Sequence, residues 1–105
     1  RPFVIIPRYI SFDKLYVGQE GTANTIIKNT SNIDATIKNI ETSSNLLELN
    51  IKEGDIIKSG ESMTITTKVV PKEKGHIRET IKLILDHPDE EFIELSAYGR
   101  AIIKN

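Results

Sequence analysis

The residues with the greatest potential for chemistry form one acidic run, Asp86–Glu91, which contains His87. Carboxylates and a histidine in a single loop could hold a cation. A Ca²⁺ site, however, takes about 6–8 oxygens from a loop of defined geometry, commonly with Gly at a sharp turn. This run has no Gly and no alternating ligands. We therefore expect a solvated loop between two strands, with a cation-binding loop as the alternative.

Other candidate chemistry is weaker. His76 follows Gly75 at an expected strand start, and no spacing of carboxylates around the histidines indicates zinc. The chain has no Cys, which excludes disulfides and Cys-based metal sites. It also has no Gly-x-Ser-x-Gly elbow and no phosphate-binding Gly-rich loop. We predict no catalytic residue, no metal ligand, no cofactor and no enzyme activity.

Length and charge narrow the class of protein further. The chain has 105 residues, which suits one domain because single cores typically need about 100–150 residues. Its formal charge is −1 with both signs interspersed, so no basic stripe predicts nucleic-acid binding. No apolar stretch approaches the roughly 18–20 residues of a membrane span. Because the chain starts at Arg1, we expect residues 1–105 to be a domain excised from a longer protein.

The elements that must carry these residues are strands. Met63–Val70 alternates apolar or Thr side chains with polar ones between a Ser-Gly-Glu turn and Pro71. Similar runs recur at about 8–12-residue spacing with turn signals between them. The expected strands cover residues 3–6 with 9–12, 21–30, 35–41, 46–51, 55–58, 63–70, 77–85 and 93–103. The chain is therefore predicted to be all-β, an Ig-like β-sandwich of about seven antiparallel strands in two sheets.

Several local features refine this prediction. Pro7 should interrupt the first strand, and Asp13–Glu20 should form a turn. The shift to Ile40 indicates a bulge. Glu79 falls on an inward face, so we place it at the rim of the sandwich, since a buried unpaired carboxylate is costly. Asn29 is expected to close a turn by bonding the backbone.

Short motifs in a fixed order suggest a family. They are Tyr9-Ile10-Ser11-Phe12, Val17-Gly18-Gln19, Thr25–Thr30, Ile37 with Ile40, Ser59-Gly60-Glu61, Val69-Val70-Pro71, Gly75 and Leu95–Gly99. Together they resemble Hydin-type (ASH) Ig-like domains, which are similar in architecture to the major sperm protein, and most closely bacterial exported Ig-like domains of unknown function. Two departures are Asp13, where Gly is usual, and Thr42-Ser43-Ser44, which replaces a Cys-Gly-Cys turn.

The resemblance implies a location but does not choose between two. Its bacterial members imply an exported protein, periplasmic or on the cell surface. Hydin-type members imply instead a ciliary or cytoskeletal scaffold.

Apolar residues on exposed faces are the remaining clue to function. Ile26 and Ile84 lie opposite the buried sets of their strands, as do Phe92 and Tyr98 opposite Leu95. If Phe92, Tyr98 and Ile84 share one sheet, they form a contact patch. The edge strands, Phe3–Phe12 or Leu46–Ile51, offer β-augmentation as a second route.

We therefore expect a non-catalytic structural or protein-interaction module. Its partners would be proteins or neighbouring domains of the same chain, with no nucleic acid and no membrane insertion. Two alternatives remain open. One is a carbohydrate- or Ca²⁺-binding module, and the other is an accessory domain of a larger enzyme.

Overall fold

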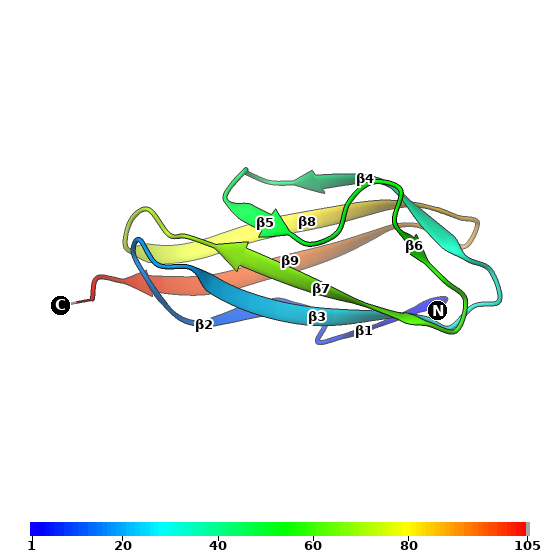
Figure 1. The fold of residues 1–105 in the computed structure, drawn as a ribbon, viewed down its shortest axis with the longest axis horizontal. Helices are drawn as coiled ribbons and strands as arrows, with labels where there is room; N and C mark the ends of the chain where they lie inside the picture. Colours follow the sequence, from blue (N-terminus) through cyan, green and yellow to red (C-terminus); the bar gives the residue numbers. More distant parts are fainter. Residues whose placement is uncertain (105) are drawn as a thin grey trace.

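The computed structural model describes residues 1–104 and consists of β-strands arranged in two packed layers (Figure 1). Asn105, the last residue of the predicted domain, lies outside the described residues. Across residues 1–104 the strands are β1 (Phe3–Ile6), β2 (Ile10–Tyr16), β3 (Gly21–Asn29), β4 (Ala35–Thr42), β5 (Leu47–Leu49), β6 (Ile56–Ile57), β7 (Ser62–Val69), β8 (Gly75–His87) and β9 (Glu90–Ile102). No helix occurs among these residues, so none could cross a membrane.

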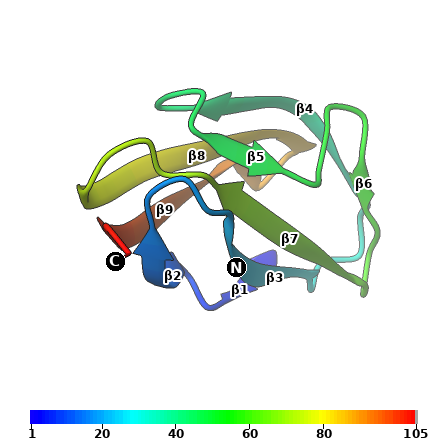
Figure 2. The ribbon, with the colours of Figure 1, turned by 60° about the vertical axis from the view of Figure 1, so that its left-hand side comes forward.

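Within this described part, the first sheet has the order β1-β3-β7-β5 and the second sheet β2-β9-β8-β4-β6. The predicted all-β sandwich is confirmed. Residues 1–104 contain nine strands, however, and β2 pairs with β9 in parallel rather than antiparallel. The parallel pairing and one of the extra strands arise at Pro7, where the predicted first strand divides: β1 joins the first sheet and β2 the second (Figure 2). Proline donates no ladder hydrogen bond, so the chain leaves one sheet there.

The core lies between the inward faces of the two sheets and follows the predicted alternation. In β7, for example, Ile65, Thr67 and Val69 are buried while Thr64 is exposed. The largest apolar side chains that are less than 2% exposed are Ile10, Ile27, Ile37, Ile57, Ile65, Ile81, Leu83, Leu95 and Val69. Burial of a side chain of this size stabilises the fold by about 1.5–3 kcal/mol.

A hydrogen bond and a close strand contact hold the segment in which the chain passes from β1 in the first sheet to β2 in the second. The buried Thr25 hydroxyl, on β3, donates a hydrogen bond to the Pro7 carbonyl. Further along, β2 packs so closely on β9 that a Cβ at Gly99 would lie 2.8 Å from Leu15 Cδ1. A side chain at position 99 would therefore force Leu15 to shift and would tighten the contact with Phe12 Cβ, which lies 3.2 Å away.

The end of β2, the bulge in β4 and the loop between β8 and β9 each differ from the prediction or refine it. Strand β2 continues to Tyr16, so the turn is shorter than Asp13–Glu20. A register shift between Ser11 and Lys14 breaks the alternation and hides the strand in the sequence. The bulge near Ile40 is confirmed by the register shift between Ile37 and Asn39. The predicted loop from Asp86 shrinks to Pro88 and Asp89, because β8 runs to His87 and β9 begins at Glu90.

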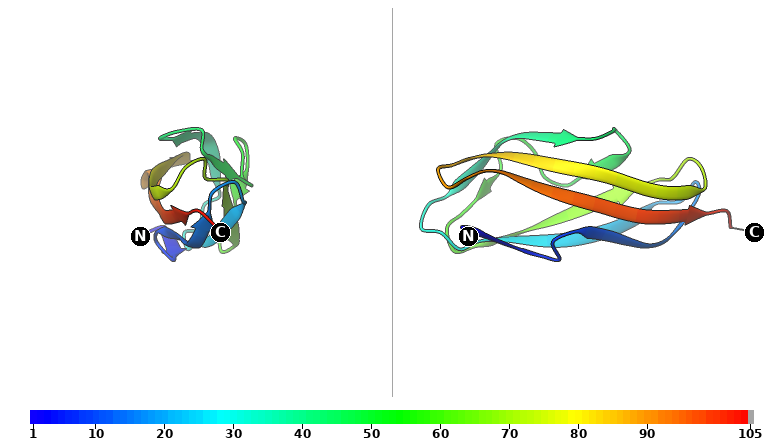
Figure 3. Two further views of the ribbon diagram at one scale, coloured as in Figure 1. Left: turned by 90° about the vertical axis from the view of Figure 1, so that its left-hand side faces the viewer. Right: turned by 180° about the vertical axis from the view of Figure 1, so that it is seen from behind.

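The molecule is elongated, with extents of 51 × 20 × 17 Å. Its two ends lie at opposite poles of the long axis (Figure 3). Strands β1, β2 and β9 all run from the pole that holds the N-terminus toward the other pole (Figures 1 and 3).

Candidate functional site

The polar residues with chemical potential gather at the pole that holds the β8–β9 turn. Asn29, at the end of β3, is completely buried. Its Nδ2 donates to the carbonyls of Ile33 and Ile57 at 2.8 and 2.9 Å. Its Oδ1 accepts from the Ser31 backbone N–H at 3.0 Å and from Ser31 Oγ at 2.7 Å. The expected role of Asn29 in closing a turn is confirmed, and it also ties three segments together.

His87 joins this group, which we call the polar cluster (Asn29, Ser31 and His87). The prediction of a solvated loop is wrong for this residue, because His87 is only 2% exposed and its ring lies edge-on to Phe3 with centroids 5.4 Å apart. His87 continues the inward alternation of Ile81, Leu83 and Leu85 along β8, so its ring points into the core. The expected strand 77–85 stops two residues short of His87, so the alternation was not extended to this ring.

The Ser31 hydroxyl and the His87 ring are spaced like a nucleophile and its general base. Their protons, however, are placed the opposite way from what catalysis requires. Ser31 Oγ lies 3.0 Å from His87 Nε2. His87 Nδ1 accepts the N–H of Asp89 at 3.1 Å, so in the neutral ring the proton resides on Nε2. Nε2 then donates to Ser31, whose own proton goes to Asn29 Oδ1. A general base must accept the proton of the nucleophile, and this ring cannot. The polar cluster is a structural network.

The first carboxylate of the acidic run bonds to the backbone of a neighbouring strand. Asp86 Oδ1 accepts the backbone N–H of Thr36 at 2.6 Å, which ties β8 to β4. Within residues 1–104, no group of three or more His, Asp or Glu side chains converges as metal ligands would. Glu79 occupies the rim position expected for it, where Oε1 accepts hydrogen bonds from Ser43 and Ser44 at 2.6 Å.

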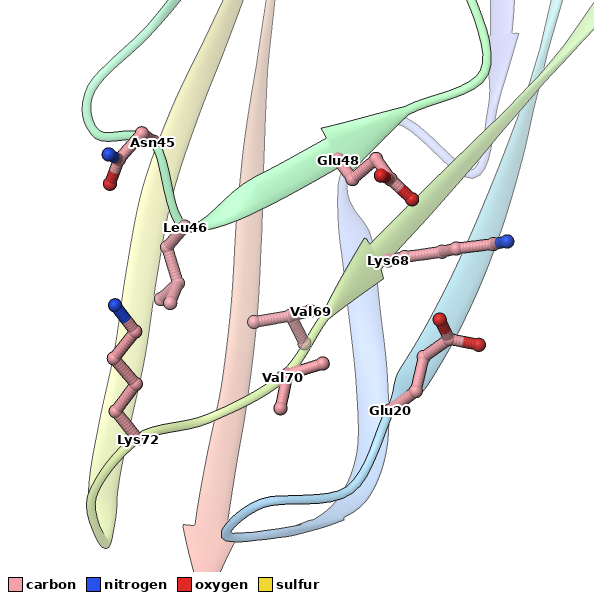
Figure 4. Close-up of a pocket in the computed structure, with 8 residues that line it drawn as sticks. All are labelled: Glu20, Asn45, Leu46, Glu48, Lys68, Val69, Val70 and Lys72. Carbon is pink, nitrogen blue, oxygen red and sulfur yellow. The ribbon is translucent and has the colours of Figure 1, made fainter.

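A shallow cleft of about 320 Å³ lies between the start of β5 and the end of β7 (Figure 4). Leu46, Val69 and Val70 line its apolar side, and Lys68 extends between Glu48 and Glu20. The figure shows these charged groups along the rim rather than converging on one point. The cleft offers no nucleophile–base pair and no anion-binding group of amides, and it suggests no reaction.

The candidate contact residues are brought together only in part. Ile84 on β8 pairs directly with Phe92 on β9, on the outer face of the second sheet. The Phe92 side chain is 48% exposed, and Lys82 Nζ lies 4.4 Å above its ring centroid. Such a contact is a cation–π interaction worth about 0.5–1 kcal/mol at an exposed site. These three residues make one apolar and cationic cluster.

Tyr98 lies on the same outer face but further along β9. It is 39% exposed, packs edge-on against Tyr9 with centroids 6.2 Å apart, and carries the Arg78 guanidinium 5.7 Å from its centroid. Tyr98 lies six positions after Phe92, which at about 3.3 Å per residue is roughly 20 Å. The face therefore holds two aromatic clusters. We call it the β8–β9 face, defined by Tyr9, Arg78, Lys82, Ile84, Phe92 and Tyr98.

Ile26 does not belong to the β8–β9 face. It lies on β3 in the first sheet, 46% exposed, opposite Ile6 of β1. The pattern of the sequence did not mark Ile6, Tyr9 or the two cations over the rings as surface contacts. Alternation marks which side chains face outward but not which strands are neighbours, so the pairs could not be found from one strand at a time. Both predicted edge segments do lie at sheet edges, as β1, β2 and β5.

Topology and packing define a class: a two-sheet sandwich whose first strand crosses between sheets. The model of the HYDIN/CFA65/VesB-like, Ig-like domain family matches residues 2–99. The chain therefore belongs to this family, and the predicted Hydin-type, Ig-like fold is confirmed. No curated protein sequence matches it.

Solved structures share the fold at low identity. The ASH / PapD-like domain 7 of human CEP192 has a TM-score of 0.78 at 10% identity, covering 99% of this chain and 87% of that one. WR4, a major sperm protein (MSP) family member from C. elegans, has a TM-score of 0.64 at 11% identity, covering 93% and 97%. The secreted serine protease VesC from Vibrio cholerae has a TM-score of 0.60 at 15% identity, covering 91% and 24%. The likeness to the major sperm protein family is thereby confirmed at the level of fold.

Proposed function

We propose that residues 1–105 form one domain that acts as a non-catalytic protein-interaction module of a larger protein, with the β8–β9 face as its contact surface. The observation that carries this proposal is the placing of Phe92 against Ile84, and of Tyr98 against Tyr9, on the solvent side of one sheet. Both aromatic rings also have a cation above them. Aromatic and Arg side chains dominate the energetics of protein interfaces.

The core supports this assignment because it is complete without these residues. The inward neighbours on β9, such as Ile93 and Leu95, are buried, while Phe92 and Tyr98 contribute little to the interior. An exposed aromatic ring that does not pack in the core is available to a partner at a small desolvation cost.

The comparisons supply further support. The CEP192 structure is one numbered domain of its protein, and this chain spans only 24% of VesC. In this protein the two chain ends lie at opposite poles (Figure 3), so a preceding and a following module would extend from different ends. The β8–β9 face would stay open to a partner between them.

The names of VesC and of Hydin support two different cellular locations. The word secreted in the name of VesC favours an exported protein, periplasmic or on the cell surface. The Hydin members of the family favour a ciliary or cytoskeletal scaffold instead. Export is the location we propose, and fractionation of cells that make the parent protein tests it.

Site-specific photo-crosslinking tests the contact surface. A photoreactive amino acid is placed at Phe92 or Tyr98 of the parent protein, and at Asn24 as the control, because Asn24 is exposed on the outer face of the first sheet. We expect one defined crosslinked protein or neighbouring domain from positions 92 and 98 and none from position 24. Equal labelling from all three positions, or no product from 92 and 98, would contradict the proposal.

A second function is favoured by the protease neighbour. The domain of VesC is part of a serine protease chain, so an accessory role beside a catalytic domain is the alternative. The sequence of the parent protein decides between the two: a fused catalytic domain supports the accessory role, and tandem copies of this sandwich support the interaction module.

A further inference from the structure

Strand β9 has an open edge along its first half. Strand β8 pairs with β9 from Glu90 to Ala101, whereas β2 pairs with it only from Ala97 to Ile102. In the part of the chain that the structure describes, no strand lies against the second edge of β9 before Ala97. The right-hand view of Figure 3 shows β2, in blue, beside the red half of β9 only.

The hydrogen-bond pattern fixes which backbone groups face this edge. The Thr80 carbonyl accepts the Ser43 N–H from the β4 side, so Thr80 and its β9 partner Ser96 form a non-hydrogen-bonded pair. By alternation, Phe92 and Glu94 also direct their N–H and C=O groups away from β8. Among residues 1–104 these groups have no strand partner.

Carboxylates outnumber cations around the open edge, although the Lys82 ammonium lies over the Phe92 ring beside it. A cleft of about 620 Å³ opens there, lined by Arg8 and by the run from Pro88 to Glu94. Asp89, Glu90, Glu91 and Glu94 contribute carboxylates, against the single guanidinium of Arg8. Phe92 adds an exposed ring beside the same edge.

We propose that an extended protein segment rich in Lys or Arg adds to this edge as a further strand, in line with β2. This inference rests on the proposed interaction function and names its partner. Main-chain bonds to Phe92 and Glu94 supply affinity, and the carboxylates select basic side chains. A second copy of this chain is the wrong occupant, because pairing two such edges would bring Glu90, Glu91 and Glu94 of each copy together.

The first test titrates the 105-residue chain with a short end-blocked peptide of alternating lysine and valine. Backbone NMR should show slower hydrogen exchange at the Phe92 and Glu94 amides, and no change at Thr22 on the far sheet. The control peptide carries N-methyl groups on the valines and cannot pair as a strand. We expect binding to fall about tenfold or more, the loss that corresponds to 1.4 kcal/mol.

Two substitutions at one position then separate charge from strand pairing. Glu94→Pro removes an N–H that bonds nothing within the domain, so the fold should survive. Glu94→Gln keeps that N–H and removes the charge. We expect the proline variant to weaken peptide binding about tenfold and the glutamine variant about two- to threefold. Glu48→Gln, on β5 of the other sheet, is the matched control and should change nothing.

The outcomes distinguish this inference from the broader proposal. Equal binding of the N-methylated peptide, unchanged exchange at Phe92 and Glu94, or self-association of the chain would each overturn strand addition. A crosslink from position 92 of the parent protein that persists in the Glu94→Pro variant would do so too, while leaving the contact surface intact. Absence of any crosslink, with normal peptide binding, would count against the contact surface alone.

Discussion

The polar cluster and the β8–β9 face meet at the turn between β8 and β9 but use their residues in opposite ways. In the cluster, Asn29 and His87 are buried and their polar atoms have partners within the chain. On the face, Phe92 and Tyr98 remain exposed, and half of the neighbouring strand edge has no partner among residues 1–104.

The difference teaches where to look for function in this fold. The residues with the most reactive side chains hold the architecture, and the residues available to a partner are aromatic rings and backbone amides. Buried polar groups stabilise only when satisfied, which explains why the cluster is closed. The following substitutions test this division.

The largest effect is expected for Asn29→Ala. This change removes four hydrogen bonds and leaves the Ile57 carbonyl buried without its donor. At roughly 1 kcal/mol per bond, with partial compensation by water, we expect a loss of about 3 kcal/mol in the free energy of unfolding. Urea denaturation measures it. Asn24→Ala, at an exposed site on the same strand, should stay within about 0.5 kcal/mol, and similar losses for both would refute the structural role.

His87→Leu is expected to cost about 2 kcal/mol, because the apolar side chain keeps the packing on Phe3 but loses the bonds to Ser31 and Asp89. His76→Leu provides the comparison at an exposed position on the same strand. Its expected effect is within about 0.5 kcal/mol. Thermal unfolding of the two variants side by side would show whether His87 belongs to the interior, and a neutral His87→Leu would place it outside.

Thr67→Val should act in the opposite direction. The Thr67 hydroxyl is fully buried and, among the residues described, has no hydrogen-bond partner. Replacing the hydroxyl with a methyl group of the same shape removes a desolvated polar atom, so we expect stabilisation of about 1 kcal/mol. Denaturant titration again gives the value. If the variant were instead less stable, the Thr67 hydroxyl would have a hydrogen-bond partner, and the prediction would be wrong.

The smallest effect is expected on the β8–β9 face. A double-mutant cycle with Tyr9→Ala and Tyr98→Ala should give a coupling free energy of about 0.5 kcal/mol, the low end for an edge-on aromatic pair. Both single variants should remain folded. A coupling as large as the effect of Asn29→Ala would mean that the face is part of the core.

Much of the fold could be predicted from the sequence because alternation is a direct physical record of a half-buried strand. Ile65, Thr67 and Val69 are buried as that pattern requires. Prediction failed where the backbone leaves the regular period. At Asp13 and Lys14 a register shift puts two exposed residues in succession, so the second half of β2 was mistaken for a turn. His87 was missed for a different reason, because β8 keeps its regular alternation for two residues beyond the expected end at Leu85.

Only part of the candidate site could be predicted from the sequence. Alternation placed Phe92, Tyr98 and Ile84 on outward faces, but the turn at Pro88 and Asp89 sets the register that pairs Ile84 with Phe92. Ile26 satisfied the same pattern and lies on the other sheet. The open half-edge of β9 depends on where β2 begins after Pro7, a distance that no local pattern encodes.

The crossing of the first strand between sheets has a mechanical consequence. Strands β2 and β9 are parallel, and the chain ends emerge at opposite poles (Figure 3). Tension applied to the two ends would pull these strands past each other along their lengths, loading the row of hydrogen bonds between them in shear. Bonds loaded in this way share the force and must fail together, whereas bonds in a peeled hairpin fail in turn. The domain is built to resist stretching along its 51 Å axis.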